Sequence, residues 1–220
     1  MSFSKEWDQI YKKNTQMSIW PFSDLISYVK RYLPFVGSSN SVLELGCGAG
    51  ANIPFFKSLE VDYFAIEGSQ TIVDQLWNEF PELKGKIKVG DFTNNIPWKK
   101  SFDIIVDRSS ITHNNTKAIK NSIKLMDKHL KKGGYFIGID WFSTKQSDYK
   151  KGKVAEDKYT KYNYTEGQFV NVGRVHFSDK NHLINLFSGF KIIIMEEKII
   201  RRDIPSDSHI FASWNFIVKK

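Results

Sequence analysis

The chain has 220 residues, 41% of them hydrophobic, which suffices for one full core and excludes two independent domains of ordinary size. No run of eighteen apolar residues occurs, and charged side chains stand among the first twenty residues, where a signal peptide needs an apolar run. We therefore expect a soluble, cytoplasmic protein without a membrane span. The single cysteine excludes an internal disulfide and leaves only His and carboxylate metal sites open, of which none is predicted.

The net charge of +8 fits either an anionic partner or a lysine-rich surface. In the segment 115–131, lysines recur at helical spacing and apolar residues fall on the opposite face. The lysines are Lys117, Lys120, Lys124, Lys128 and Lys131. No nucleic-acid motif accompanies them, so we interpret the row as the solvated side of an amphipathic helix rather than an anion-binding stripe. We predict no DNA partner, and the sequence disfavours an RNA partner.

The N-terminal region, residues 1–40, contains two helical patterns, 4–13 and 23–32, which we expect to pack at the ligand-binding end of the following sheet. From residue 41 to 141, short apolar runs alternate with longer amphipathic ones, a pattern typical of a parallel sheet with crossover helices. The expected strands are 41–45, 63–67, 87–91, 103–107 and 135–141. The expected helices are 51–58, 69–79 and 115–131, the last of them ending at a C-cap formed by Gly133-Gly134.

The segment 142–178 is polar and only weakly periodic, which indicates either a long loop or a small lid over a substrate site. After it, the pattern predicts a helix over 179–187 and two apolar strands, 190–200 and 211–218. We expect these strands to form an antiparallel hairpin. Residues 1–220 are therefore predicted to form a single domain.

The first expected strand runs into the glycine turn Gly46-Cys47-Gly48-Ala49-Gly50. Its spacing, Gly46-x-Gly48-x-x-Ala51, also fits the dinucleotide-binding fingerprint, and Glu67 lies 21 residues after Gly46, where a ribose-binding acid belongs. Glycines let the backbone touch a ligand, and the acid accepts hydrogen bonds from ribose hydroxyls. The turn alone does not distinguish one nucleoside-containing cofactor from another.

Four further features narrow the choice of cofactor. Glu44 lies inside the first strand, where a dinucleotide-binding fold usually has an apolar residue, and it favours a ligand with a cationic end. Asp91 ends the expected third strand and Phe92 comes directly after it, where a carboxylate can accept from an adenine amino group and an aromatic ring can stack near the base. Asp107-Arg108 closes the fourth strand. The fourth feature is the terminal hairpin.

In this order, the elements resemble the class I S-adenosylmethionine-dependent methyltransferases, over residues 41–141 and by the position of the terminal hairpin. The resemblance implies an α/β fold: a Rossmann-like seven-stranded sheet, mostly parallel with an antiparallel last strand, and helices on both faces. It implies S-adenosylmethionine as cofactor, with S-adenosylhomocysteine as product. The cofactor-binding residues it implies are Glu44, Gly46, Cys47, Gly48, Gly50, Glu67, Gly68, Ser69, Asp91, Phe92, Asp107 and Arg108.

Methyl transfer requires an aligned acceptor, exclusion of water and, for a poor nucleophile, removal of a proton. His113 follows the fourth strand and is the candidate general base because its ordinary pKa lies near neutrality, although it could instead only brace the turn before the next helix. Arg108 has two interpretations, an anchor for an acidic substrate group or an internal ion pair. Candidate substrate contacts are Tyr11, Trp20 and Trp141 as pocket walls, and Arg174 and His176 in the lid.

Missing motifs narrow the acceptor. The Asn/Asp-Pro-Pro-aromatic sequence of enzymes that methylate exocyclic nucleobase amines is missing, and the sole cysteine lies in the glycine turn, which excludes covalent C5-pyrimidine methylation. We therefore predict a small-molecule acceptor with an O, N or S nucleophile, methylated by in-line displacement, and a monomer or homodimer. The alternatives are a methyltransferase acting on protein or RNA, an NAD(P)-dependent oxidoreductase, and a fold that binds the cofactor without catalysis.

Overall fold

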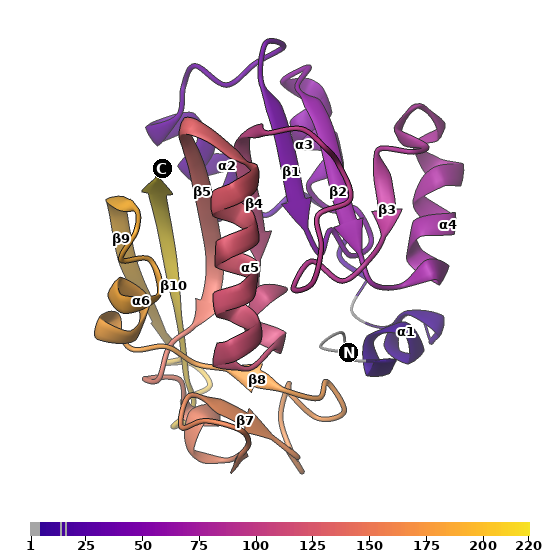
Figure 1. Ribbon diagram of the computed structural model, residues 1–220. Coiled ribbons are helices and arrows are strands. Elements are labelled where there is room, and N and C mark those ends of the chain that lie inside the picture. The colour runs from indigo at the N-terminus through magenta and orange to yellow at the C-terminus, as the bar shows by residue number, and fades with distance from the viewer. Residues whose placement is uncertain (1–4, 14, 16) are drawn as a thin grey trace.

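The computed structural model describes residues 5–13, 15 and 17–220, so the predicted first residue of the N-terminal helix, Ser4, lies outside the described residues. A seven-stranded sheet with the order β3-β2-β1-β4-β5-β10-β9 forms the centre of the molecule (Figure 1). Its strands are β1 (Ser41–Leu45), β2 (Asp62–Glu67), β3 (Ile87–Val89), β4 (Phe102–Arg108), β5 (Leu130–Phe142), β9 (Lys191–Arg201) and β10 (Ile210–Lys219). Only β10 runs antiparallel to its neighbours, β5 and β9.

Helices cover both faces of this sheet. On one face lie α2 (Ser23–Tyr32), α3 (Ile53–Ser58) and α4 (Gln70–Glu79), and on the other lie α5 (Thr116–His129) and α6 (Lys180–Leu186). Alternating residues of each strand enter the two cores, as with Val42 and Leu43 of β1. The predicted fold class is confirmed. Within residues 5–13, 15 and 17–220, no helix has the length and apolar character needed to cross a membrane.

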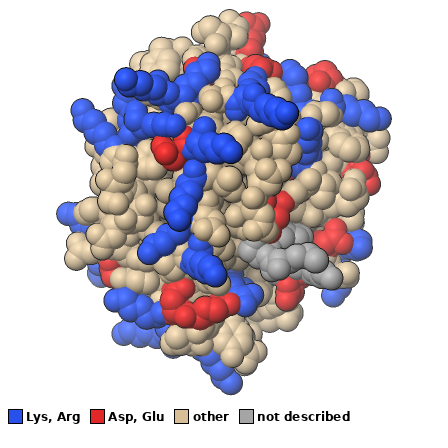
Figure 2. All heavy atoms as spheres, in the orientation of Figure 1, with Lys and Arg blue, Asp and Glu red and all other residues tan. Residues whose placement is uncertain are grey.

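Helix α5 has the amphipathic character that its lysine spacing predicts. Ile119, Ile123 and Met126 are buried against the sheet, whereas Lys117, Lys120, Lys124 and Lys128 are exposed. Figure 2 shows lysine and arginine side chains along the part of the surface that α5 occupies in Figure 1. Asn115 caps the helix by accepting a 3.0 Å hydrogen bond from Ala118 N.

Two predicted boundaries are wrong. Helix α5 ends at His129 and β5 begins at Leu130, so Gly133-Gly134 lies inside the strand rather than capping the helix. Close packing against β4 explains the glycine at position 134, because a Cβ there would lie 2.9 Å from the carbonyl oxygen of Asp103. Strand β3 ends at Val89, so Asp91 belongs to the following turn, where its carboxylate accepts from Thr93 N.

Residues 142–178 form a folded segment, which we call the lid. It contains a small sheet of β6 (Lys153–Val154), β7 (Thr160–Tyr162) and β8 (Val175–His176), and the 3-10 helix η3 (Ser147–Lys150). Its own hydrophobic cluster consists of Phe142, Tyr164, Phe169, Val172, Val175 and Phe177. The segment is therefore folded rather than a long irregular loop, and its role as a lid over a substrate site stays a prediction.

The lid and α1 (Lys5–Lys12) lie beyond the ends of the parallel strands, below the sheet in Figure 1. The expectation that both N-terminal helices pack at this end is correct for α1 and wrong for α2. Helix α2 packs on a face of the sheet, since Leu25, Tyr28 and Val29 are buried in that core. The structure also contains two further 3-10 turns, η1 (Pro81–Leu83) and η2 (Ile111–His113). Turn η2 connects β4 to α5.

Candidate active site

The glycine turn after β1 is a tight backbone loop. Gly46, Gly48 and Gly50 all have positive φ angles, of 70°, 51° and 82°. At Gly46 there is also no space for a side chain, because a Cβ would lie 2.2 Å from the hydroxyl oxygen of Ser110. That hydroxyl donates a 2.9 Å hydrogen bond to the Gly46 carbonyl oxygen. The turn therefore requires glycine and leaves its backbone open to a ligand.

Glu67 ends β2 beside this loop. It is only 4% exposed, and its two carboxylate oxygens accept from Gly48 N at 2.9 Å and from Ser69 N at 3.0 Å. Burial raises the pKa of Glu67, while the backbone N–H donors of Ser69, Gly48 and Gly68 oppose this shift. A carboxylate has about four acceptor positions, so it can still accept from ligand hydroxyl groups.

Glu44 is a second buried carboxylate, on β1 itself. Its oxygens accept from Asn52 Nδ2 at 2.7 Å and from Tyr63 Oη at 2.5 Å. The Asn52 carboxamide is held in turn by Phe22 N, which donates to its oxygen at 3.2 Å. Burial raises the pKa of Glu44 to about 7, against these two donors. A cation nearby would favour its ionised form.

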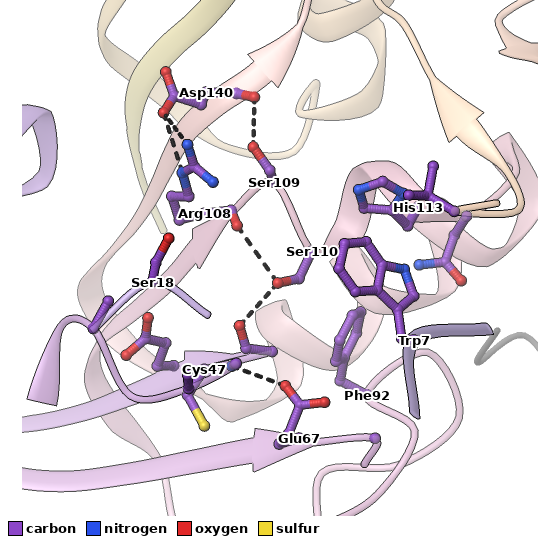
Figure 3. A pocket seen from close by; sticks show the side chains of 18 of the residues that line it. Trp7, Ser18, Cys47, Glu67, Phe92, Arg108, Ser109, Ser110, His113 and Asp140 are labelled. Carbon is purple, nitrogen blue, oxygen red and sulfur yellow. Dashed lines mark hydrogen bonds and ion pairs between the residues drawn. The ribbon is translucent and has the colours of Figure 1, made fainter. Parts of the chain in front are cut away.

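A cavity of about 350 Å³ lies between the glycine turn, the ends of β2 and β4, α1 and the lid (Figure 3). This volume falls in the range of small-ligand sites. Nine of the twelve cofactor residues implied by the resemblance line it: Glu44, Gly46, Cys47, Gly48, Glu67, Gly68, Asp91, Phe92 and Arg108. The fold thus brings together side chains from the ends of four strands.

Gly50 and Ser69 do not line the cavity. Gly50 packs against α4, where a Cβ would lie 2.6 Å from a side-chain carbon of Leu76. Ser69 is fully buried and caps α4, since its hydroxyl oxygen accepts from Ile72 N and the hydroxyl donates to Asp8 at 2.7 Å. Both residues therefore shape the site, and their expected role as cofactor contacts stays a prediction.

Asp107 and Trp141 are likewise placed behind the cavity rather than on its wall. Asp107 is fully buried and accepts from Ser110 N, Ile111 N and the Trp141 indole N–H, the last at 2.7 Å. Burial raises the pKa of Asp107 to about 7. The Trp141 ring packs in the core with Phe187 and has no exposed surface. This pair holds the turn after β4, and the expectation of Trp141 as a pocket wall is corrected.

The other candidate substrate contacts differ in whether their side chains line the cavity. Tyr11 lines the cavity, whereas Trp20 is 79% exposed and lies outside it. The Arg174 side chain pairs with Glu156 and lines a neighbouring groove, and only its backbone carbonyl reaches His113, at 3.0 Å from Nδ1. The expectations for Trp20 and Arg174 as substrate contacts are therefore corrected.

His176 is buried between β7 and α6. Its Nδ1 lies 3.1 Å from the Thr160 hydroxyl, and its Nε2 lies 3.0 Å from Nε2 of His182. Because the Thr160 hydroxyl donates to Asp157, Nδ1 of His176 must donate to Thr160, and Nε2 must accept from His182. His176 is thus part of the internal structure of the lid and not a substrate contact.

Arg108 forms the internal ion pair that was one of its two expected roles. Its other expected role, as an anchor for an acidic substrate group, stays open. Its Nε and Nη2 donate to one oxygen of Asp140 at 3.1 and 3.0 Å, so the internal partner is Asp140. The guanidinium also stacks on the Phe22 ring, 3.9 Å from its centroid, and lines the cavity. Lys198 binds the other Asp140 oxygen at 2.9 Å. The remaining N–H groups of Arg108 are sufficient for an additional acceptor.

Sequence reasoning missed several lining residues. Trp7 lies one helical turn before Tyr11, so both side chains share a face of α1. This i, i+4 spacing could have predicted Trp7 as a cavity residue once Tyr11 was chosen. Phe142 and Phe169 come from the lid, and Asn52 from the start of α3. No short motif marks these three, since the positions of Phe142 and Phe169 depend on how the lid folds back over the sheet, and that of Asn52 depends on the fold of the glycine turn.

A family model described as a methyltransferase domain matches residues 42–134. No curated protein matches the chain in a sequence search. Many solved structures have a similar fold, among them the following three. TehB from Haemophilus influenzae is 20% identical, with a TM-score of 0.62 over 98% of this chain and 67% of TehB. The N-methyltransferase NodS from Bradyrhizobium japonicum, in complex with S-adenosylhomocysteine, is 11% identical, with a TM-score of 0.64 over 99% of both chains.

The third is the Burkholderia thailandensis 1,6-didemethyltoxoflavin-N1-methyltransferase, 12% identical, with a TM-score of 0.66 over 98% of this chain and 84% of that one. S-adenosylmethionine suits the cavity, since a glycine backbone and two buried carboxylates, Glu44 and Glu67, match a ligand with ribose hydroxyls and a cationic end. The chain thus has the fold of the class I S-adenosylmethionine-dependent methyltransferases, and its residues 42–134 match the model of a methyltransferase domain.

Proposed function

We propose that the protein methylates an O, N or S atom of a small molecule by in-line displacement. The observation that carries this proposal is the cavity itself, because α1, the lid and the glycine turn together enclose it and leave about 350 Å³. The 1,6-didemethyltoxoflavin-N1-methyltransferase of similar fold, solved with bound 1,6-didemethyltoxoflavin and S-adenosylhomocysteine, supports a small acceptor in such a site.

The cofactor, when bound, supplies an electrophilic methyl group on a sulfonium. In our proposal Glu67 accepts hydrogen bonds from its ribose hydroxyls, and Asp91 and Phe92 contact its adenine. Glu44 faces its ammonium group. Arg108, already fixed by Asp140, binds its carboxylate with the N–H groups that the ion pair leaves over. Gly50, Ser69 and Asp107 act by shaping these contacts.

His113 is proposed to receive the acceptor's proton. Its Nδ1 lies 3.0 Å from a carbonyl oxygen, which can only accept, so Nδ1 carries the hydrogen and Nε2 carries the lone pair. Burial lowers the pKa of His113 to about 4, so the ring is neutral at physiological pH and a weak base. It therefore suits acceptors whose N–H or O–H becomes acidic as the new bond to carbon forms.

A screen for S-adenosylhomocysteine release tests the proposal. Purified protein is incubated with S-adenosylmethionine and a panel of small phenols, heterocycles, amines, thiols and acids, with Glu67→Gln as the inactive comparison. We expect turnover of at least one small molecule by the wild type. The same assay with total RNA and with denatured protein tests whether the exposed lysine row of α5 docks a macromolecular acceptor. Methylation of the RNA or of the protein, without turnover of any small molecule, would overturn the small-molecule proposal.

A further inference from the structure

Aromatic rings from four parts of the chain form one continuous wall of the cavity. They are Trp7 of α1, His113 of η2, Phe142 at the end of β5 and Phe169 of the lid. Neighbouring rings contact edge to face, with centroid distances of 4.8 Å for Trp7–His113, 5.9 Å for His113–Phe142 and 4.9 Å for Phe142–Phe169. Because each ring is held by the next, this aromatic wall is formed before any ligand binds.

The aromatic wall offers a ligand one side-chain hydrogen-bond acceptor, Nε2 of His113, since the indole N–H of Trp7 can only donate. Figure 3 shows His113 and Trp7 together, across the cavity from Arg108. The charged side chains among the described lining residues are Glu44, Glu67, Asp91, Arg108 and Asp140, and none of them belongs to the wall. Arg108 and Asp140 also neutralise each other, with Lys198 and Asp24 completing a balanced network of two cations and two anions.

A ligand pressed against this wall therefore meets apolar surface and one acceptor atom, Nε2 of His113. A charged acceptor would lose its hydration there without gaining a counter-ion, which is costly. A flat ring, in contrast, matches the shape and polarity of the neighbouring rings. An N–H or O–H on that ring would satisfy Nε2, whose partner nitrogen is already bound to the Arg174 carbonyl.

We propose that the acceptor is a flat, uncharged aromatic or heteroaromatic molecule that donates an N–H or O–H to Nε2 of His113. This inference rests on the proposed function and specifies its substrate. The acceptor's nitrogen or oxygen lone pair forms the new bond to the methyl carbon, and the carbon–sulfur bond breaks with its electron pair remaining on sulfur. The acceptor's proton passes to Nε2 of His113 and from there to solvent.

The experiment compares three size-matched acceptor sets: neutral heteroaromatic N–H or O–H compounds, aliphatic amines and aromatic carboxylates. S-adenosylhomocysteine release is measured for wild type, Trp7→Leu, Phe169→Leu and His113→Phe, with Trp20→Leu as the matched control outside the cavity. We expect turnover only in the neutral heteroaromatic set. Trp7→Leu and Phe169→Leu raise the acceptor KM about tenfold or more, whereas His113→Phe retains the ring and lowers mainly kcat, by about tenfold or more.

The binding of S-adenosylhomocysteine, measured by calorimetry for each variant, separates the two levels of the proposal. Turnover of the amines or carboxylates with KM values unaffected by Trp7→Leu would overturn the acceptor class. Failure of every heteroaromatic compound, while S-adenosylhomocysteine binds normally, would also overturn it and leave the methyltransferase assignment intact. Failure of the wild type to bind S-adenosylhomocysteine would overturn the proposed function itself.

Discussion

Glu44 and Glu67 are two buried carboxylates with different surroundings. Glu67 accepts from backbone N–H groups of the turns that it joins, whereas Glu44 accepts from the side chains of Asn52 and Tyr63. Their spacing along the chain made both predictable as ligand contacts. The partners of Glu44 were not predictable, because Asn52 reaches it only through the fold of the glycine turn.

We predict that cofactor affinity rises with pH through the titration of Glu44. Its pKa in the free protein is about 7, and a bound ammonium group favours the ionised carboxylate, so the affinity for S-adenosylhomocysteine falls by up to about tenfold for each pH unit below 7 and levels off above it. Calorimetry between pH 5.5 and 8.5 measures this dependence.

The control for this prediction is Glu44→Gln, which retains the side-chain shape and cannot ionise. Asp107 also has a pKa near 7 but lies behind the cavity, so any slope that survives in Glu44→Gln belongs to it or to other groups. An unchanged pH dependence in Glu44→Gln would contradict the role of Glu44 as the counter-charge.

Two of the residues that sequence reasoning misplaced, Trp141 and His176, were misplaced for the same physical reason. Trp141 and His176 stand near the expected site along the chain, but each points into a core, Trp141 toward Phe187 and His176 toward His182. A strand alternates its side chains between two faces, and the sequence alone does not say which face a lid will cover.

At the scale of elements, the lid is held by a hydrogen-bonded chain as well as by its hydrophobic cluster. Thr116 N, at the start of α5, and the Thr160 hydroxyl both donate to Asp157, and Thr160 accepts from His176. The strands of this region are two or three residues long, which is too short to show the period of a strand. The sequence therefore left loop and lid as alternatives, whereas the longer elements of 41–141 were predicted to within a few residues.

The hydrogen-bonded series through His176 makes the stability of the lid sensitive to acid. Burial lowers the pKa of His176 to about 3, well below its ordinary value of 6.5, so the unfolded state takes up a proton first and the stabilisation is lost as pH falls from 6.5 toward 3. We predict that the Tm of the wild type falls between pH 6.5 and 5. His176→Asn is less stable at pH 7.5 but loses less on acidification.

Thermal unfolding of both proteins across this pH range checks the prediction. His113 also has a lowered pKa and gives both proteins a common slope. His182, whose pKa is lowered too, is hydrogen-bonded to His176, so the difference between the two curves belongs to the His176–His182 pair. Parallel curves would show that the His176 ring does not contribute to the acid sensitivity.

At the scale of the whole molecule, the strand order explains where the site is. Strand β1 has β2 and β3 on one side and β4 and β5 on the other, so the chain reverses direction across the sheet next to β1. In such sheets, ligands bind in the crevice at the carboxyl ends of the strands beside that point. The glycine turn after β1 and Arg108 at the end of β4 lie there, and α1 and the lid close the crevice.

The central claim, that this crevice binds S-adenosylmethionine through Glu67, is tested most directly by calorimetry with S-adenosylhomocysteine and NADH. We predict that the wild type binds S-adenosylhomocysteine and not NADH. Glu67→Gln should bind about 10- to 100-fold more weakly, as expected for losing charged hydrogen bonds, whereas the exposed matched control Glu79→Gln binds like the wild type. Binding of NADH without S-adenosylhomocysteine, or equal affinity in a folded Glu67→Gln variant, would contradict the account.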